Sequence, residues 1–251
     1  MDLGLDGSVA LVTGGAKGVG LGISRVLAEA GAAVVTCGRS APAQLPNGLE
    51  FLTCDVRDPE QVDRLVATIA ERHGRLDIAV NNAGGSPYAL AADASPRFAS
   101  KIVELNLLAP LVVAQAANAL MQQQAAGGAI VMVSSVSGHR PSPGTSAYGA
   151  AKAGLDNLAA SLAVEWAPKV RVNSVAAGMV RTEQSHLHYG GEDELAAVGR
   201  TVPLGRLAEP DEIGRCVAFL ASPLASYVSG AMLLAHGGGE RPAFLDAARE
   251  Q

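Results

Sequence analysis

The chain has 251 residues, 49% of them hydrophobic and 17% charged, a composition that excludes a disordered protein and allows one large globular domain. Its net charge of −5 and its 4% of aromatic residues offer neither a basic surface nor stacking platforms, so we expect no nucleic-acid partner. Three scattered cysteines, and an acidic N-terminus that runs straight into the first predicted strand, favour a cytoplasmic protein without a disulfide framework or a signal peptide.

The sequence also favours neither a membrane nor a metal as a partner. No apolar run approaches the length of a membrane helix, so we predict no membrane attachment. Metal-ligand spacing is found only at His186 and His188, which we interpret as solvated loop residues. We therefore predict no metal site.

The first predicted elements are a strand at 9–12, a glycine-rich turn, a helix at 21–30 that Gly31 ends, and a second strand at 33–37. This is the unit that holds a dinucleotide pyrophosphate at a helix N-terminus. Gly14, Gly18 and Gly20 let the backbone approach the phosphates, while the free N–H groups and the helix dipole attract their charge. A glycine turn without a ligand is the alternative, and the flanking strand and helix make it the weaker one.

Strands and helices alternate through the rest of the chain. We expect further strands at 49–53, 76–80, 129–133, 170–174 and 231–234, and helices at about 59–73, 95–124, 147–167 and 210–221. This alternation predicts an α/β Rossmann fold, a doubly wound parallel sheet of about seven strands with helices on both faces. Without repeats or linkers, 1–251 is predicted to form a single domain.

Two segments suggest a lid and a subunit contact. Segment 182–203 is polar and follows the C-terminal end of a predicted strand, where ligands bind in such sheets, so we interpret it as a substrate lid. No charged residue occurs between Glu104 and Arg140. A helix without a charged face is buried on more than one side, and we expect it to contact a partner subunit in a homotetramer or, as second choice, a homodimer. Neutral glutamines on a solvated face are the alternative.

Tyr148 and Lys152 stand four residues apart on a predicted helix, which places both side chains on one face. A free tyrosine titrates near about pH 10. A nearby ammonium lowers that pKa, so the pair is a candidate site of proton transfer, although such pairs are usually surface neighbours.

Taken in order, these motifs resemble the short-chain dehydrogenase/reductase family, in its 3-oxoacyl-carrier-protein-reductase-like branch, from Val9 to about Gly239. The glycine turn matches the family's cofactor turn, Asp55-Val56 its adenine contact, and Asn81-Asn82-Ala83-Gly84 the motif after its fourth strand. Its catalytic tetrad is matched, with the serine 13 residues before the tyrosine, by Asn106, Ser135, Tyr148 and Lys152.

The resemblance implies an enzyme that interconverts a carbonyl and a secondary alcohol with a nicotinamide cofactor carrying the hydride. Tyr148 would donate or remove the proton, and Lys152 would lower the pKa of Tyr148 and hold the nicotinamide ribose. Ser135 would steady the substrate oxygen and Asn106 would anchor a water that links Lys152 to solvent. Ser134 is an equally good strand-end hydroxyl, and only the spacing favours Ser135.

The end of the second strand predicts the cofactor. Gly38 stands where an acidic residue would select NAD(H), while Arg39 and Lys17 can pair with a 2′-phosphate, so we predict NADP(H), with NAD(H) possible if both are merely solvated charges. The cofactor-binding residues implied by the resemblance are Gly14, Lys17, Gly18, Val19, Gly20, Arg39, Asp55, Val56, Asn82, Ala83, Gly84, Tyr148, Lys152, Gly178, Val180 and Thr182.

Two positions depart from the family pattern, Ala177 where Pro is usual and His236 where Asp is common. The first predicts a softer nicotinamide-side loop. Gly138, Pro141, Pro143 and Gly144 shape a turn without obvious charge, which predicts a neutral or apolar small-molecule substrate. A reductase of 3-oxoacyl thioesters is one alternative, favoured by Lys169 but not by the uncharged segment 122–126. A non-catalytic dinucleotide-binding regulatory protein is another, and the complete tetrad argues against it.

Overall fold

Seven parallel strands form one sheet in the computed structural model, which describes residues 2–248. The strand order is β3-β2-β1-β4-β5-β6-β7, so the predicted doubly wound fold is confirmed. The chain moves outward from β1 to β3 and then returns to build the other half from β4, which places a topological switch point between β1 and β4. The strands are β1 Val9–Thr13, β2 Ala33–Gly38, β3 Leu49–Thr53, β4 Ile78–Asn81, β5 Gly128–Ser135, β6 Val170–Ala177 and β7 Met232–Ala235.

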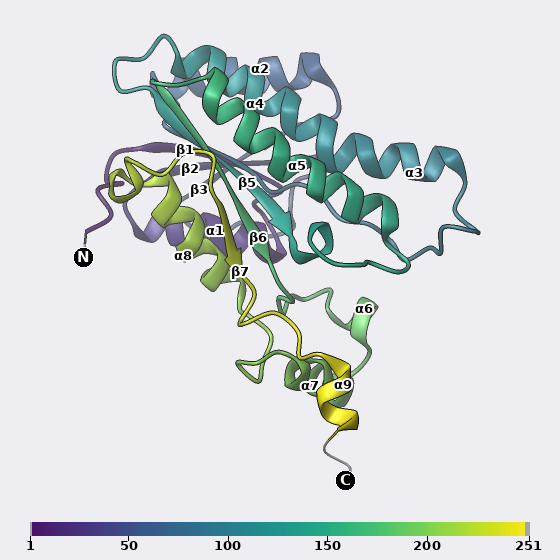
Figure 1. Cartoon of the computed structure of the whole chain (residues 1–251). Helices are drawn as coiled ribbons and strands as arrows, with labels where there is room; N and C mark the ends of the chain where they lie inside the picture. Colours follow the sequence, from purple (N-terminus) through teal and green to yellow (C-terminus); the bar gives the residue numbers. More distant parts are fainter. Residues whose placement is uncertain (1, 249–251) are drawn as a thin grey trace.

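Helices cover both faces of the sheet (Figure 1). On one face lie α1 (Gly18–Glu29) and α8 (Pro210–Ala221), and on the other α2 (Pro59–His73), α4 (Ala109–Met121) and α5 (Ser146–Glu165). Successive side chains of each strand enter opposite cores, because the strand period is two. In β1, for example, Leu11 packs with the second group of helices and Val12 with the first.

The predicted helix at 95–124 is one continuous run with a π-helical turn in its middle. It consists of α3 (Pro96–Val103), the turn Glu104–Leu108 and α4. By length and composition alone this run could cross a membrane, so the prediction that no such segment exists is wrong. In the fold it packs on the sheet, where Val113, Ala117 and Met121 are fully buried.

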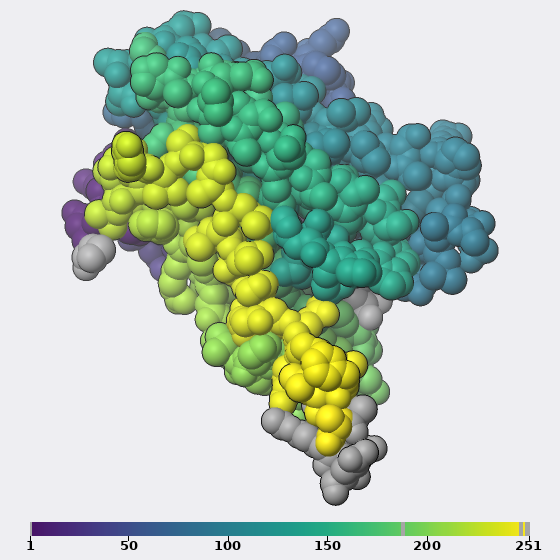
Figure 2. Space-filling model, viewed as in Figure 1, coloured from purple at the N-terminus to yellow at the C-terminus, as the bar shows by residue number. Residues whose placement is uncertain are grey.

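The predicted lid 182–203 contains two helices that the sequence reading did not anticipate, α6 (His186–Tyr189) and α7 (Glu192–Thr201). With α9 (Ala243–Ala247) they form a narrow projection beyond the ends of β6 and β7 (Figures 1 and 2). A backbone hydrogen bond of 2.9 Å, from Arg241 N to the carbonyl oxygen of Thr201, joins the end of α7 to the segment before α9. The N-terminal acids and C-terminal arginine of α7 suit its dipole and were an available signal.

Arg171 closes the opposite end of the sheet. Its guanidinium, carried by β6, donates to the carbonyl oxygens of Leu220, Ala221 and Ser222 at the end of α8, and to that of Val228, at 2.8–3.2 Å. The last carbonyl groups of a helix have no hydrogen-bond partner within the helix, and a cation at this end also interacts favourably with the helix dipole. Arg171 therefore fastens α8 to the amino ends of the strands.

Candidate active site

The turn between β1 and α1 has the shape of a phosphate cradle. Gly14 and Gly18 adopt φ of +64° and +52°, and α1 begins without a side-chain cap. A Cβ at Gly20 would lie 2.3 Å from the carbonyl oxygen of Gly14, so the turn requires glycine there. Free backbone N–H groups at a helix start with room for close approach fit a pyrophosphate.

Asn82 and Ala83 are joined to this turn across the switch point. The backbone N–H groups of both residues donate to the hydroxyl of Thr13, each at 3.0 Å. The side-chain amide of Asn82 donates to the carbonyl oxygens of Thr13 and Gly14 at 3.0 and 3.3 Å. The predicted cofactor residues after β1 and β4 therefore form one hydrogen-bonded unit.

Asp55 is held by a residue that the sequence analysis missed. The Arg57 guanidinium donates to both carboxylate oxygens of Asp55, at 3.0 and 2.6 Å, and this bond holds the pKa of Asp55 below its usual range. Next to Asp55, the side chain of Val56 is buried in the core, so its backbone is the part that a cofactor can reach. Val19, in the first turn of α1, also packs against the core.

Arg39 and Lys17 remain available at the adenine side. Both are exposed, and neither side chain makes a hydrogen bond or ion pair within residues 2–248. A backbone bond of 2.9 Å from Cys54 N to the carbonyl oxygen of Gly38 links the segments that carry Arg39 and Asp55. The charge of Arg39 contributes to the lowered pKa of Asp55, which shows that the two groups are close.

Ser135, Tyr148 and Lys152 meet at the carboxyl end of β5. Ser135 is the last residue of β5, and its side chain lies near enough to that of Tyr148 in the first turn of α5 to lower the Tyr148 pKa. The Nζ atom of Lys152 lies 5.6 Å from the centroid of the Tyr148 ring and donates to the carbonyl oxygen of Val133 at 2.7 Å. Burial raises the pKa of Tyr148, and the interaction with Ser135 offsets this only in part. Lys152 is not among the groups that shift the pKa of Tyr148 here, so its lowering of that pKa stays a prediction.

Asn106 lies in the π-helical turn and is fully buried. Its amide accepts from Gly85 N at 2.8 Å and donates to the carbonyl oxygens of Gly85 and Ile102 at 3.0 and 2.9 Å. A Cβ at Gly84 would meet Asn106 Oδ1 at 2.6 Å and Lys152 Nζ at 3.5 Å, so these three residues lie together. The side-chain amide of Asn106 thus holds the loop after β4. Its expected role as the anchor of a water stays a prediction.

The segment after β6 crosses back over the glycine turn. The methyl group of Thr182 lies 3.6 Å from the position of a Cβ at Gly18, and Val180 pairs with Ala208. Gly178 packs against His236, because a Cβ there would lie 2.7 Å from the Cα of His236. His236, one of the two departures from the family pattern, therefore lies directly beside the predicted cofactor segment.

Tyr189, Arg140 and Tyr88 come from three segments that follow the carboxyl ends of β6, β5 and β4. Tyr189 of α6 lies near enough to affect the pKa of Tyr148, and Arg140 forms an ion pair of 2.6 Å with Glu240. Tyr88 lies against Gly144, whose carbonyl oxygen accepts from Ala89 N at 2.8 Å. His186 is exposed, and the side chain of His188 lies outside the described residues.

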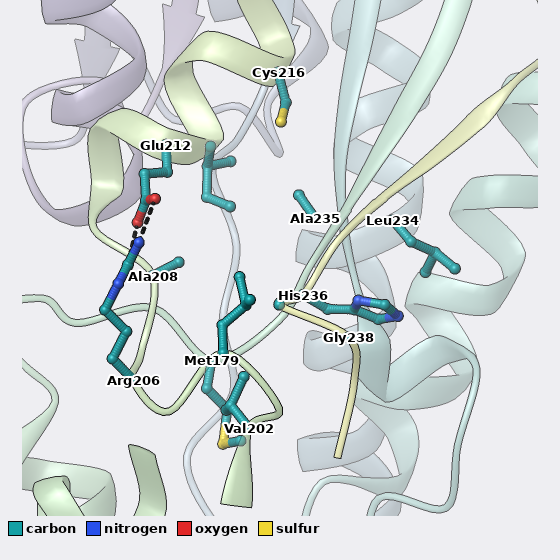
Figure 3. A pocket seen from close by; sticks show the side chains of 13 residues that line it. Met179, Val202, Arg206, Ala208, Glu212, Cys216, Leu234, Ala235, His236 and Gly238 are labelled. Carbon is teal, nitrogen blue, oxygen red and sulfur yellow. Dashed lines mark hydrogen bonds and ion pairs between the residues drawn. The ribbon is translucent and has the colours of Figure 1, made fainter. Parts of the chain in front are cut away.

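A cavity of about 340 Å³ lies between α8 and the ends of β6 and β7 (Figure 3). It is bounded by Met179, the Arg206–Glu212 ion pair and the end of β7, and no residue of the tetrad lines it. Catalysis needs the reacting atoms beside Tyr148. We therefore do not place the substrate in this cavity.

Comparison with known proteins agrees with this architecture. The family model described as Enoyl-(Acyl carrier protein) reductase matches residues 14–240. The chain is 36% identical over 245 residues to human dehydrogenase/reductase SDR family member 4, covering 93% of this chain and 88% of the relative. It is 36% identical over 243 residues to the 3-oxoacyl-[acyl-carrier-protein] reductase of Vibrio cholerae, covering 94% and 98%. The ligand-free aldohexose dehydrogenase of Thermoplasma acidophilum has a TM-score of 0.88 at 28% identity, covering 93% and 94%. The chain therefore belongs to the short-chain dehydrogenase/reductase family, whose members are oxidoreductases that use NAD(P)(H) and act on CH–OH and C=O groups.

Proposed function

We propose that the protein is an NADP(H)-dependent enzyme that reduces a carbonyl to a secondary alcohol, or the reverse, with Tyr148 as proton donor or acceptor. The observation that carries this proposal is the convergence of Ser135, Tyr148 and Lys152 at the carboxyl end of β5. The glycine turn lies at the same edge of the sheet, where ligands bind in doubly wound folds.

The roles follow from these contacts. NADP(H), when bound, supplies or accepts the hydride. The raised pKa of Tyr148 keeps its hydroxyl protonated at neutral pH, which suits a proton donor in reduction. Ser135, whose side chain lies near that hydroxyl, can donate to the same substrate oxygen, and the Lys152 ammonium stabilises the phenolate that remains. Asn106 acts by holding the loop of Gly85 beside Lys152.

Ser134 does not compete for this role, although it is the neighbouring hydroxyl. Its side chain is buried and lies 2.7 Å from a carboxylate oxygen of Asp156, which is two helical turns beyond Tyr148 on α5. Successive side chains of a strand point to opposite faces, so only one of the two serines can reach the substrate.

We further propose a neutral substrate enclosed by segment 182–203. The one arginine of the turn after β5, Arg140, is paired with Glu240, which removes its net charge from the entrance. Tyr189 and Thr182 reach from this segment towards Tyr148 and Gly18, as a lid must. Lys169, the residue that favoured an acyl-carrier substrate, donates to the carbonyl oxygens of Gln122 and Gln124 at the amino end of β6.

Loss of NADPH absorbance with a panel of neutral ketones, aldoses and 3-oxoacyl thioesters tests the function and names the substrate class. With the best substrate, Tyr148→Phe should slow single-turnover reduction by about 10²–10⁴-fold, because general acid catalysis contributes this much. Ser135→Ala should also slow it, and the matched variant Ser134→Ala much less. A Tyr148→Phe rate equal to the parent's, with chemistry rate-limiting, would refute the proton-transfer role. NADPH binding without turnover on any compound would favour a regulatory protein.

A further inference from the structure

A buried carboxylate lies one helical turn beyond Lys152 and has no part in the tetrad. Asp156 follows Lys152 by four residues on α5, as Lys152 follows Tyr148, so three titratable side chains share one helix face. Only 10% of the Asp156 side chain is exposed. A carboxylate this deep in a protein is costly unless other groups stabilise its charge.

Two side chains hold one oxygen of this carboxylate. Ser134 Oγ lies 2.7 Å and His139 Nε2 lies 2.8 Å from Asp156 Oδ2. The Ser134 hydroxyl also lies 3.2 Å from the backbone carbonyl oxygen of Lys152. Oδ1 is buried and has no hydrogen-bond partner among the described residues. Two groups beside this carboxylate can stabilise a negative charge on it, His139 when it is protonated and Lys152 one helical turn away.

Lys152 is the more deeply buried of these two groups. Its side chain is 3% exposed, and its Nζ atom donates to the carbonyl oxygen of Val133. The other polar groups that face it are the Tyr148 ring from α5, Asn106 from the π-helical turn and, through Asp156, His139 from the loop after β5. Burial lowers the pKa of Lys152 to about 8, and the charge of Asp156 raises it. Among these groups Asp156 alone carries a negative charge.

We propose that Asp156 is a positioning residue of the active site, whose buried carboxylate, held by Ser134 and His139, keeps Lys152 in the ammonium form beside Tyr148. The inference rests on the proposed function, because that function uses the ammonium. The His139 side chain is 33% exposed, so the cluster also extends from the buried lysine to the protein surface. A cation at position 139 would offset the charge of Asp156, and Asp156 would then raise the pKa of Lys152 less.

Nuclear magnetic resonance of protein with labelled lysine side chains measures this effect without a substrate. The chain has four lysines, so the signals are few, and Lys152→Met identifies the one of interest. Asp156→Asn keeps the shape and removes the charge, and it should lower the pKa of Lys152 by about one unit. Asp156→Glu should restore it. Asp211→Asn removes a carboxylate of α8 that pairs with Arg25 of α1 on the opposite face of the sheet. This variant should leave the pKa of Lys152 unchanged. An equal Lys152 pKa in Asp156→Asn and the parent would overturn the proposal.

His139→Arg tests the same cluster from its exposed side and leaves the core intact, so it serves if Asp156→Asn does not fold. A permanent cation beside Oδ2 should lower the pKa of Lys152 in the same direction, and no change would again contradict the inference. The pH profile of NADPH-dependent turnover separates this inference from the proposed function. If Asp156→Asn lowers the Lys152 pKa but the profile stays in place, the role of Asp156 stands and Lys152 leaves the proposed mechanism.

Discussion

Lys152 carries a cost in stability that follows from its burial. Its folded pKa of about 8 lies below its ordinary value of 10.5, so the unfolded chain binds more protons between these two pH values. Stability should therefore rise with pH through this window, and below it the whole penalty is present. Lys152→Met should raise the free energy of unfolding at pH 7 by up to about 3 kcal/mol while turnover is lost. Urea unfolding at pH 7 and pH 10 measures the gain, which should shrink at the higher pH; a constant gain would point to packing.

Arg39 should decide the choice of cofactor, because an exposed guanidinium without a partner can take a phosphate as a fork. Equilibrium titration should show tighter binding of NADPH than of NADH. Arg39→Ala should remove most of that difference, since a charge-assisted hydrogen bond contributes about 1.5–3 kcal/mol, and Lys17→Ala should reduce it less. Arg215→Ala, a matched loss of an exposed arginine on α8, should change neither affinity. Equal affinities in the parent protein would contradict the prediction.

The sequence could predict single residues where local spacing carries the chemistry. The four-residue spacing of Tyr148 and Lys152 and the glycines of the first turn are of this kind, and the structure brings them to one edge of the sheet. Asp156 follows Lys152 at the same spacing, but nothing in the sequence alone assigns it to the site. The Arg57–Asp55 pair lies two residues apart and was equally visible, but only coordinates show that its guanidinium reaches the carboxylate.

At the scale of elements, the β1–α1 turn tolerates no side chain at Gly20. Gly20→Ala would drive its Cβ into the carbonyl oxygen of Gly14 and the amide of Asn82, which lie 2.3 and 2.5 Å from its position. We expect NADPH affinity to fall by at least tenfold, because both groups shape the phosphate cradle. Fluorescence titration of NADPH measures it. Gly154→Ala adds the same methyl group 3.3 Å from the end of the Leu107 side chain, which can move by a few tenths of an ångström, and this variant should bind NADPH normally. Normal binding by Gly20→Ala would rule out a cradle of this shape.

The strands could be placed to within about three residues because each begins as an apolar run. The ends of β5 and β6 were missed, since Ser134-Ser135 and Ala176-Ala177 are polar or small and are held as strand by pairing with each other. The π-helical turn was missed for a similar reason. Its Asn106 bonds to Gly85, a contact between residues 21 positions apart that no local pattern reports.

At the scale of the whole molecule, we predict a homotetramer in which the outward faces of α4 and α5 meet partner subunits. Several exposed positions there are small or apolar, among them Ala119, Ala160 and Val164, the last with 80% of its surface exposed. Val113, on the inward face of α4, is buried in the core, so a charge there would test folding and not assembly. Val164→Glu should give smaller species by light scattering at micromolar concentration, and Ala67→Glu on the exposed side of α2 should not. A monomeric parent protein would refute the prediction.

The Arg171 clasp makes the two edges of the sheet unequal in a way that bears on motion. At the amino edge one guanidinium ties β6 to four carbonyl oxygens near the end of α8, whereas the carboxyl edge carries exposed helices and loops. Local opening should therefore be rare at the first edge and frequent at the second. Amide hydrogens near Arg171 should exchange with deuterium only through global unfolding, while those of α6 and α7 exchange freely. Such a gradient would let the mouth of the site open and close many times within the life of one folded molecule.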